Sequence, residues 1–172
     1  MTIVTLNKEE IRTITLLATQ RWLEKIDSTD RPNYATGKAS GALEHELLAT
    51  IRANAVEWAV AKHYNLSWNI PFYTNDLHPR RKDLPDVGKN LEVRSLRTRN
   101  EVPVWDKDVS KNAIIVAGRV LDTDYYTRVE ILGYIKAEDA IKPDWWSPEH
   151  KCWRVPVTAL SQNRRNDHNS TE

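Results

Sequence analysis

The stretch "LPDVGKNLEVRS", residues 84–95, has the pattern of two short strands around a tight turn. Its central Gly-Lys-Asn triplet, residues 88–90, holds two residue types that tolerate the positive φ angles of such turns. A turn centred on the lysine places Asp86 opposite Glu92, with Cβ atoms roughly 4.5 to 5.5 Å apart. Carboxylates held that close repel one another unless a cation lies between them or one takes a proton. The sequence therefore predicts either an ordinary hairpin or a site for a divalent metal ion.

Apolar and charged residues alternate on either side of this turn. The apolar residues, which we expect to face the core, are Val87, Leu91 and Val93. Asp86, Glu92 and Arg94 share the other face, and Mg²⁺ is typically bound by one or two carboxylates, several waters and a substrate phosphate. A simpler interpretation has Asp86 as a turn residue and Glu92 as a surface residue paired with Arg94 or Lys89. The spacing alone leaves both interpretations open, because a D-x5-E-x-R pattern is common by accident.

The length and composition fit one globular domain. We expect the 172 residues to form a single domain over 1–160 and a disordered polar tail over 161–172. Cys152 is the only cysteine, which excludes an internal disulfide and a zinc site of several thiolates, and fits a reducing environment. No apolar run approaches the roughly 20 residues that span a bilayer, and the N-terminus lacks a signal-peptide pattern. We expect a soluble, cytoplasmic protein without a membrane partner.

Positive charge is concentrated around the expected hairpin. The formal net charge of the chain is only +1, so the whole protein is not a polycation that would coat nucleic acid. Residues 78–99, however, carry seven Lys and Arg against three Asp and Glu. Any affinity for nucleic acid should therefore be local to this segment.

Hydrophobic periodicity predicts two long helices followed by strands. Asn7 and Glu10 form a capping box that opens a helix over residues 8–26, and residues 27–41 have the composition of a long loop. A second apolar stripe predicts a helix over 42–64. Strands are expected at 66–73, 91–97, 113–120, 125–135 and 152–157, with the third and fourth joined as a hairpin by "LDTD". A short helix and a loop are expected between the last two strands. This order indicates an α+β fold with a mostly antiparallel sheet.

Two glutamates on the second helix lie three turns apart and so share a face. Glu46 is expected on a solvated flank of the helix. Glu57 lies among small residues, where the helix can pack closely on a sheet. Two further acids, Asp106 and Asp108, are expected in a loop and not at a metal, whereas Cys152 is expected in the core.

The hairpin and the preceding helix resemble the PD-(D/E)xK nuclease superfamily. The resemblance lies in "PD" at 85–86, "EVR" at 92–94 and "VEWAVAKHYNL" at 56–66. It is closest to small phage and prophage proteins of that type, in which a glutamate-bearing helix precedes a "DVG…EVR" hairpin. The segments "ILGYIKAEDAIKPDWW" and "WRVPVTAL" also resemble that group, so the likeness covers residues 41–160 and omits the first forty.

The resemblance implies a fold and a set of site residues. The fold is a central mixed β-sheet flanked by helices, a restriction-endonuclease-like core to which this chain adds an N-terminal helix. Asp86 and Glu92 match the metal-binding acids, Glu57 matches the helix glutamate that completes the metal site, and Arg94 stands where the family has lysine. The implied catalytic residues are thus Asp86, Glu92 and Arg94. Arginine can bind or orient a phosphate but stays charged at any relevant pH, so it cannot replace a lysine that gives up its proton.

The implied activity is hydrolysis of a nucleic-acid backbone, DNA foremost, with Mg²⁺ or Mn²⁺ as cofactor. The residues expected to contact backbone phosphates are Arg80, Arg81, Lys82, Arg97 and Arg99. The protein could work as a homodimer or in a complex with a phage or host protein. If a phage encodes the chain, we expect it in the cytoplasm of the bacterial host. The alternative is a catalytically degenerate protein of the same fold that binds nucleic acid or a protein partner.

Overall fold

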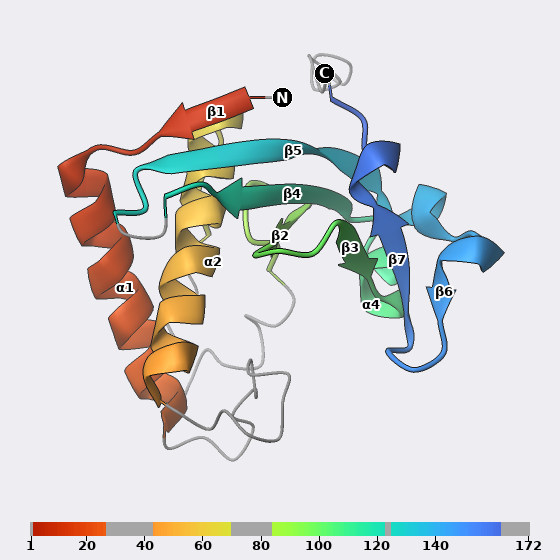
Figure 1. The fold of residues 1–172 in the computed structure, drawn as a ribbon, viewed down its shortest axis with the longest axis horizontal. Helices are drawn as coiled ribbons and strands as arrows, with labels where there is room; N and C mark the ends of the chain where they lie inside the picture. Colours follow the sequence, from red (N-terminus) through yellow and green to blue (C-terminus); the bar gives the residue numbers. More distant parts are fainter. Residues whose placement is uncertain (1, 27–42, 70–83, 123–124, 163–172) are drawn as a thin grey trace.

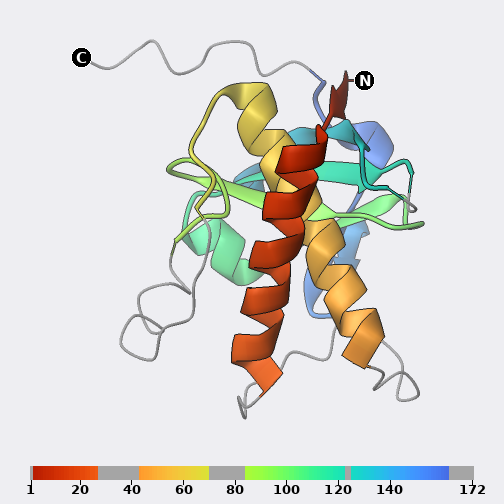
Figure 2. The ribbon, with the colours of Figure 1, turned by 90° about the vertical axis from the view of Figure 1, so that its left-hand side faces the viewer.

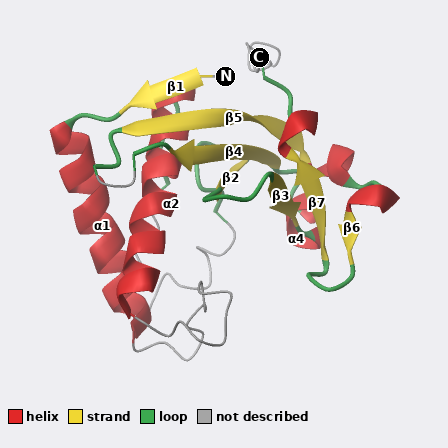
Figure 3. Ribbon diagram, viewed as in Figure 1, coloured by secondary structure: helices red, strands yellow, loops and turns green. Residues whose placement is uncertain are grey.

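The computed structural model describes residues 2–26, 43–69, 84–122 and 125–162 (Figure 1). Its elements are, in order, β1 (Thr2–Thr5), α1 (Lys8–Ile26), α2 (Leu43–Tyr64), β2 (Leu91–Ser95), β3 (Glu101–Val104), α4 (Asp106–Ser110), β4 (Ile114–Val120), β5 (Arg128–Lys136), β6 (Trp146–Ser147) and β7 (Cys152–Pro156). Short 3-10 helices occupy Ala137–Ala140, Pro143–Trp145 and Val157–Ala159. The fold is α+β, as the sequence predicts (Figure 3).

The strands form two sheets. The larger sheet has the order β1-β5-β4-β2, and the smaller one has the order β3-β7-β6. β1, β5 and β4 pair antiparallel, whereas β2 pairs parallel with β4, which makes the larger sheet mixed. The parallel pair arises because the chain leaves β2 and passes through β3 and α4 before it returns as β4. The predicted hairpin of β4 and β5 is confirmed.

Different layers cover the two faces of the larger sheet. α2 packs on β2 and β4, and α1 packs along α2 (Figures 1 and 2). Val56 of α2 and Val116 of β4 belong to the apolar cluster between helix and sheet. The preceding residue, Ile115, points to the opposite face and belongs to a second cluster with Val155 of β7. The small sheet therefore covers the face that the helices leave open.

α2 lies close to β4 because Gly118 has no side chain. A Cβ built at Gly118 would lie 2.6 Å from Cγ1 of Val56, which is too close for any real carbon. The small residues that sequence analysis noted around Glu57 thus do pack against the sheet, since Val56, Ala59 and Val60 are fully buried. This close approach sets the distance between the backbone at Glu57 and the strands.

The helix predictions agree closely with the structure. The capping box is present: Asn7 Oδ1 accepts hydrogen bonds from the backbone N–H of Glu9 and Glu10, at 3.0 and 2.9 Å, and Glu10 Oε2 accepts one from the N–H of Asn7 at 2.7 Å. Cys152 is buried, as expected.

None of the helices among the described residues is long and apolar enough to cross a membrane.

Several expectations differ from the structure. Glu46 is buried and not solvated as expected. Asp106 and Asp108 lie in helix α4 and not in a loop. The sequence analysis missed four elements: β1, β3, α4 and β6.

The first two residues of the predicted disordered tail, residues 161–172, contact the larger sheet and are not disordered. Ser161 pairs with Tyr134, and the side-chain amide of Gln162 donates a 2.8 Å hydrogen bond to the carbonyl of Leu132. These contacts anchor the first two residues of the segment to β5. The remaining residues of the tail, the predicted loop over 27–41 and most of the strand predicted at 66–73 lie outside the described residues.

Candidate functional site

The turn at the start of β2 has the predicted geometry. The N–H of Val87 donates to the carbonyl of Leu91, and the N–H of Leu91 donates back to the carbonyl of Val87, both at 3.1 Å. Gly88 adopts φ of +60°, the left-handed conformation that favours glycine. Val87 and Leu91 are fully buried, so the inward face of the alternation is confirmed. Asp86 and Glu92, the residues just outside this pair, therefore lie opposite one another.

Asp86 is held from two sides. Its Oδ2 accepts a 2.8 Å hydrogen bond from the backbone N–H of Val93, and its carbonyl accepts one of 3.0 Å from the N–H of Asn69. The side-chain amide of Asn69 donates to the carbonyls of Pro85 and Gly88, at 3.0 and 2.7 Å. The segment that follows α2 thus fixes the backbone on both sides of Asp86, and β2 fixes its carboxylate.

The same segment connects Asp86 to Glu57. Trp68 pairs with Val87 through its backbone, and its indole N–H donates a 2.9 Å hydrogen bond to Glu57 Oε2. The other carboxylate oxygen of Glu57 lies 3.6 Å from the guanidinium of Arg21, on α1. Burial and the negative charge of Asp86 raise the pKa of Glu57 to about 7, against the opposing effects of Arg21 and Trp68.

Glu92 lies on the other side of Asp86. Its side chain is 13% exposed. Burial raises its pKa, and the negative charges of Asp86 and Asp108 add to this effect, whereas the charges of Arg94 and Lys111 oppose it. Asp86 is therefore the charged neighbour of both glutamates. The structure brings the three predicted acids into one row: Glu57, Asp86, Glu92.

The guanidinium of Arg94 lies between Glu92 and Asp108 of α4, and its shorter contact is with Asp108. One guanidinium nitrogen donates a 2.7 Å hydrogen bond to Asp108 Oδ2, whereas the other lies 3.5 Å from Glu92 Oε2. The Nε group donates to the carbonyl of Pro103 at 3.3 Å, and the guanidinium carbon lies 4.8 Å from the ring centroid of Trp105. The arginine side chain is only 12% exposed. Its strongest partners therefore belong to β3 and α4.

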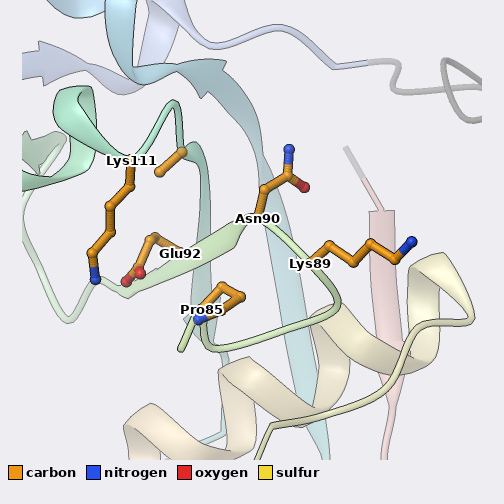
Figure 4. A pocket seen from close by; sticks show the side chains of 6 residues that line it. Pro85, Lys89, Asn90, Glu92 and Lys111 are labelled. Atoms are coloured by element: carbon orange, nitrogen blue, oxygen red, sulfur yellow. The ribbon is translucent and has the colours of Figure 1, made fainter. Parts of the chain in front are cut away.

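A pocket of about 210 Å³ opens beside Glu92. It is lined by Pro85, Lys89, Asn90, Glu92, Lys111 and Ala113 (Figure 4). In Figure 4 the ammonium group of Lys111 and the carboxylate of Glu92 point toward one another, whereas Lys89 points away from Glu92. The pocket thus joins a carboxylate of the predicted site to a lysine that follows α4.

Two of the predicted metal ligands, Asp86 and Glu92, are left as candidates for a metal site. Among the described residues, no group of three or more Asp, Glu, His or Cys side chains is arranged to hold a metal ion, so the three predicted ligands are not gathered as one set. Glu57 already accepts from Trp68 and lies near Arg21. Asp86 and Glu92 remain the pair that would hold Mg²⁺ or Mn²⁺, which need only one or two carboxylates beside water and phosphate. When bound, such an ion activates water and polarises a phosphoryl oxygen.

The predicted phosphate-binding residues are placed only in part. Arg97 and Arg99 are exposed, but β2 ends at Ser95, so they follow the strand and do not continue it as expected. Arg80, Arg81 and Lys82 lie outside the described residues.

Sequence reasoning missed five residues that shape the site. They are Arg21, Trp68, Asn69, Asp108 and Lys111. All five come from elements or segments other than the hairpin, and no spacing in the chain marks them. The residue three positions before Asp108 is Trp105, which is not a capping residue type, so the start of α4 has no capping signature in the sequence.

Comparison of the chain with protein-family models, with curated proteins and with solved structures gives no match.

Proposed function

We propose that this protein is a metal-dependent nuclease that hydrolyses phosphodiester bonds, with DNA as the first substrate to test. The observation that supports it best is the placement of Asp86 opposite Glu92 across a tight turn, beside an open pocket. A fold that holds two carboxylates in this way carries a repulsion that a divalent cation would relieve. The resemblance of "PD" and "EVR" to a nuclease superfamily agrees with this assignment.

Each acid has a distinct part in the proposed reaction. Asp86 and Glu92 bind the cation, and the hydrogen bond from Val93 keeps the carboxylate of Asp86 directed across β2. Glu57, with a pKa of about 7, can hold or release a proton near neutral pH, as a general acid or base requires. Trp68 and Arg21 orient its carboxylate.

The second candidate function is binding without cleavage. The observation that favours it is the engagement of Arg94 by Asp108 at 2.7 Å and by Glu92 at 3.5 Å, which occupies this cation with protein carboxylates. A nuclease-fold protein that binds nucleic acid, or a phage or host protein, would keep the scaffold and lack turnover. Assembly as a homodimer is compatible with either function.

The test is a cleavage assay on single- and double-stranded DNA and RNA with Mg²⁺ or Mn²⁺. Asp86→Asn and Glu92→Gln should each abolish cleavage, because each removes one charge from the metal-binding pair. Glu149→Gln is the control, since that side chain is 85% exposed and lies in the segment between β6 and β7. Cleavage that survives both substitutions would show that the catalytic site does not include Asp86 and Glu92.

Calorimetric titration with Mn²⁺ separates the two candidates. A nuclease should bind the ion and lose this binding in Asp86→Asn. The absence of both ion binding and cleavage in the parent protein would rule out the metal-dependent nuclease. Nucleic-acid binding in that case would identify the second candidate.

A further inference from the structure

The cation at the position that matches the superfamily's lysine, Arg94, does not line the pocket. Its guanidinium is bound to Asp108, to the carbonyl of Pro103 and to the face of Trp105, and it lies 3.5 Å from Glu92. The carboxylate of Asp108 is itself almost fully buried, with 1% of the side chain exposed, and also accepts the backbone N–H of Trp105. Arg94 therefore neutralises a buried acid, and a substrate phosphate would have to compete with that pair.

The side chain of Lys111 brings a positive charge to the pocket. Lys111 directly follows α4. Its backbone N–H donates a 3.3 Å hydrogen bond to the carbonyl of Lys107, which closes the last turn of the helix. Asn112 then adopts φ of +50°, and this sharp turn leads the chain into β4. The residue is exposed, and its side chain lines the pocket together with Glu92.

The parallel pairing of β2 with β4 sets this position. The N–H of Ile114 donates a 2.9 Å hydrogen bond to the carbonyl of Asn90, so the start of β4 lies beside the start of β2. Residues just before β4 must therefore lie near residues at the start of β2. This is why Lys111, nineteen positions after Glu92, faces it across the pocket (Figure 4).

The charges that line the pocket favour an anion. Two lysines, Lys89 and Lys111, line it against one carboxylate, Glu92. A backbone phosphodiester carries a single negative charge and accepts hydrogen bonds from an ammonium group. Once the charge of Glu92 is taken up by a cation, Lys111 is the nearest positive side chain in the pocket for such a phosphate.

We propose that Lys111 is the residue that contacts the backbone phosphate of a nucleic-acid substrate in this pocket, and that Arg94 is a positioning residue. The proposal rests on the function proposed above. Lys111 reaches the pocket from the position just after α4, whereas the sequence motif assigns the phosphate-binding cation to position 94. The two cations thus divide tasks that the family pattern assigns to one lysine.

The test measures binding of labelled single- and double-stranded DNA and RNA oligonucleotides over a range of salt concentrations. All variants are made in a Glu92→Gln background and measured in EDTA, so that neither cleavage nor the charge of Glu92 interferes. Lys111→Gln should weaken binding about tenfold. It should also reduce the salt slope, the steepness with which the logarithm of the binding constant falls with the logarithm of the salt concentration, by about one, as expected for one lost phosphate contact. Lys111→Arg should restore both, because it keeps the charge. Lys107→Gln, an exposed lysine of α4 outside the pocket lining, is the matched control and should change neither.

Arg94→Met is the second arm. It should lower the melting temperature and leave the salt slope unchanged. Unchanged binding and slope in Lys111→Gln, an equal loss in Lys107→Gln, or no binding of any probe by the parent protein would each overturn the proposal. Cleavage by the parent protein combined with normal binding by Lys111→Gln would overturn this inference alone. Binding through Lys111 without cleavage under any metal condition would support it and overturn the nuclease function.

Discussion

Arg94 of β2 and Asp108 of α4 form a 2.7 Å ion pair between two side chains that are 12% and 1% exposed. The pair joins the strand that carries Glu92 to the helix that precedes Lys111. Asp108 also accepts the N–H of Trp105, so the same carboxylate starts the helix and receives the arginine. The pair therefore ties α4 to β2.

Breaking this pair should cost more stability than any surface charge change. Arg94→Met leaves Asp108 buried and unpaired, and Asp108→Asn leaves the arginine without its strongest partner. Each should lower the free energy of unfolding by about 3 to 5 kcal/mol, measured by urea denaturation. The double variant should lose less than the sum of the two single losses, because the interaction can be lost only once.

Arg12→Ala is the comparison for that experiment. Its partner Glu9 and the arginine are 77% and 76% exposed, and pairs of this kind contribute at most about 1 kcal/mol. Equal losses at Arg12 and Arg94 would contradict the structural role of the buried pair.

Glu57 should make the protein less stable as the pH rises toward neutrality. Its pKa is raised from 4.5 to about 7, so the folded state holds a proton that the unfolded state releases. The free energy of unfolding should fall between about pH 4.5 and pH 7, by about 3 kcal/mol from this group, and stay low above that. Glu92, whose pKa is also raised, acts in the same direction.

Glu57→Gln should flatten this pH dependence, measured by urea denaturation at several pH values in EDTA. Glu9→Gln, an exposed glutamate of the same protein, should leave the parent profile unchanged. A profile of equal slope in Glu57→Gln and the parent would show that Glu57 is not the group responsible.

Trp68→Phe should raise the pKa of Glu57 further. The indole N–H donates to Glu57 Oε2 at 2.9 Å and favours the charged carboxylate, so its removal favours the proton. A ¹³C NMR titration of the side-chain carboxyl measures the change directly. Trp153→Phe, in the other sheet, makes the same chemical change away from Glu57 and should have no effect. A lowered or constant pKa in Trp68→Phe would contradict the hydrogen bond.

Gly88→Ala should disturb the turn that presents Asp86. Gly88 adopts φ of +60°, and a Cβ there would lie 3.1 Å from Cδ1 of Leu66. The expected loss of unfolding free energy is about 1 to 2 kcal/mol, measured by urea denaturation. Lys89→Ala, an exposed residue of the same turn, should stay within about 0.5 kcal/mol of the parent. Similar losses at both positions would show that the left-handed backbone is not the cause.

Local patterns in the chain were sufficient for the two long helices and the turn. The capping box of Asn7 and Glu10 marks the start of α1, and the Gly-Lys-Asn triplet marks the turn before β2. Both signals depend on neighbours within a few residues, so they are readable without the fold. The strands of the β4–β5 hairpin were found for the same reason.

Long-range pairing was not readable in this way. β1 and β3 are four residues long, and each pairs with a strand far along the chain. The burial of Asp108 likewise depends on Arg94, which lies fourteen positions earlier in the chain. A stretch of four or five residues does not reveal such partners.

The sequence by itself determined that Asp86 and Glu92 oppose one another, because a turn residue pattern and the two-residue period of a strand act over a few positions. Only the tertiary structure decided which groups surround that pair. The parallel pairing of β2 with β4 brings Lys111 to Glu92, and the segment after α2 brings Trp68 and Glu57 to Asp86. These contacts join residues that are distant in the chain, and packing of the sheet against α2 sets them.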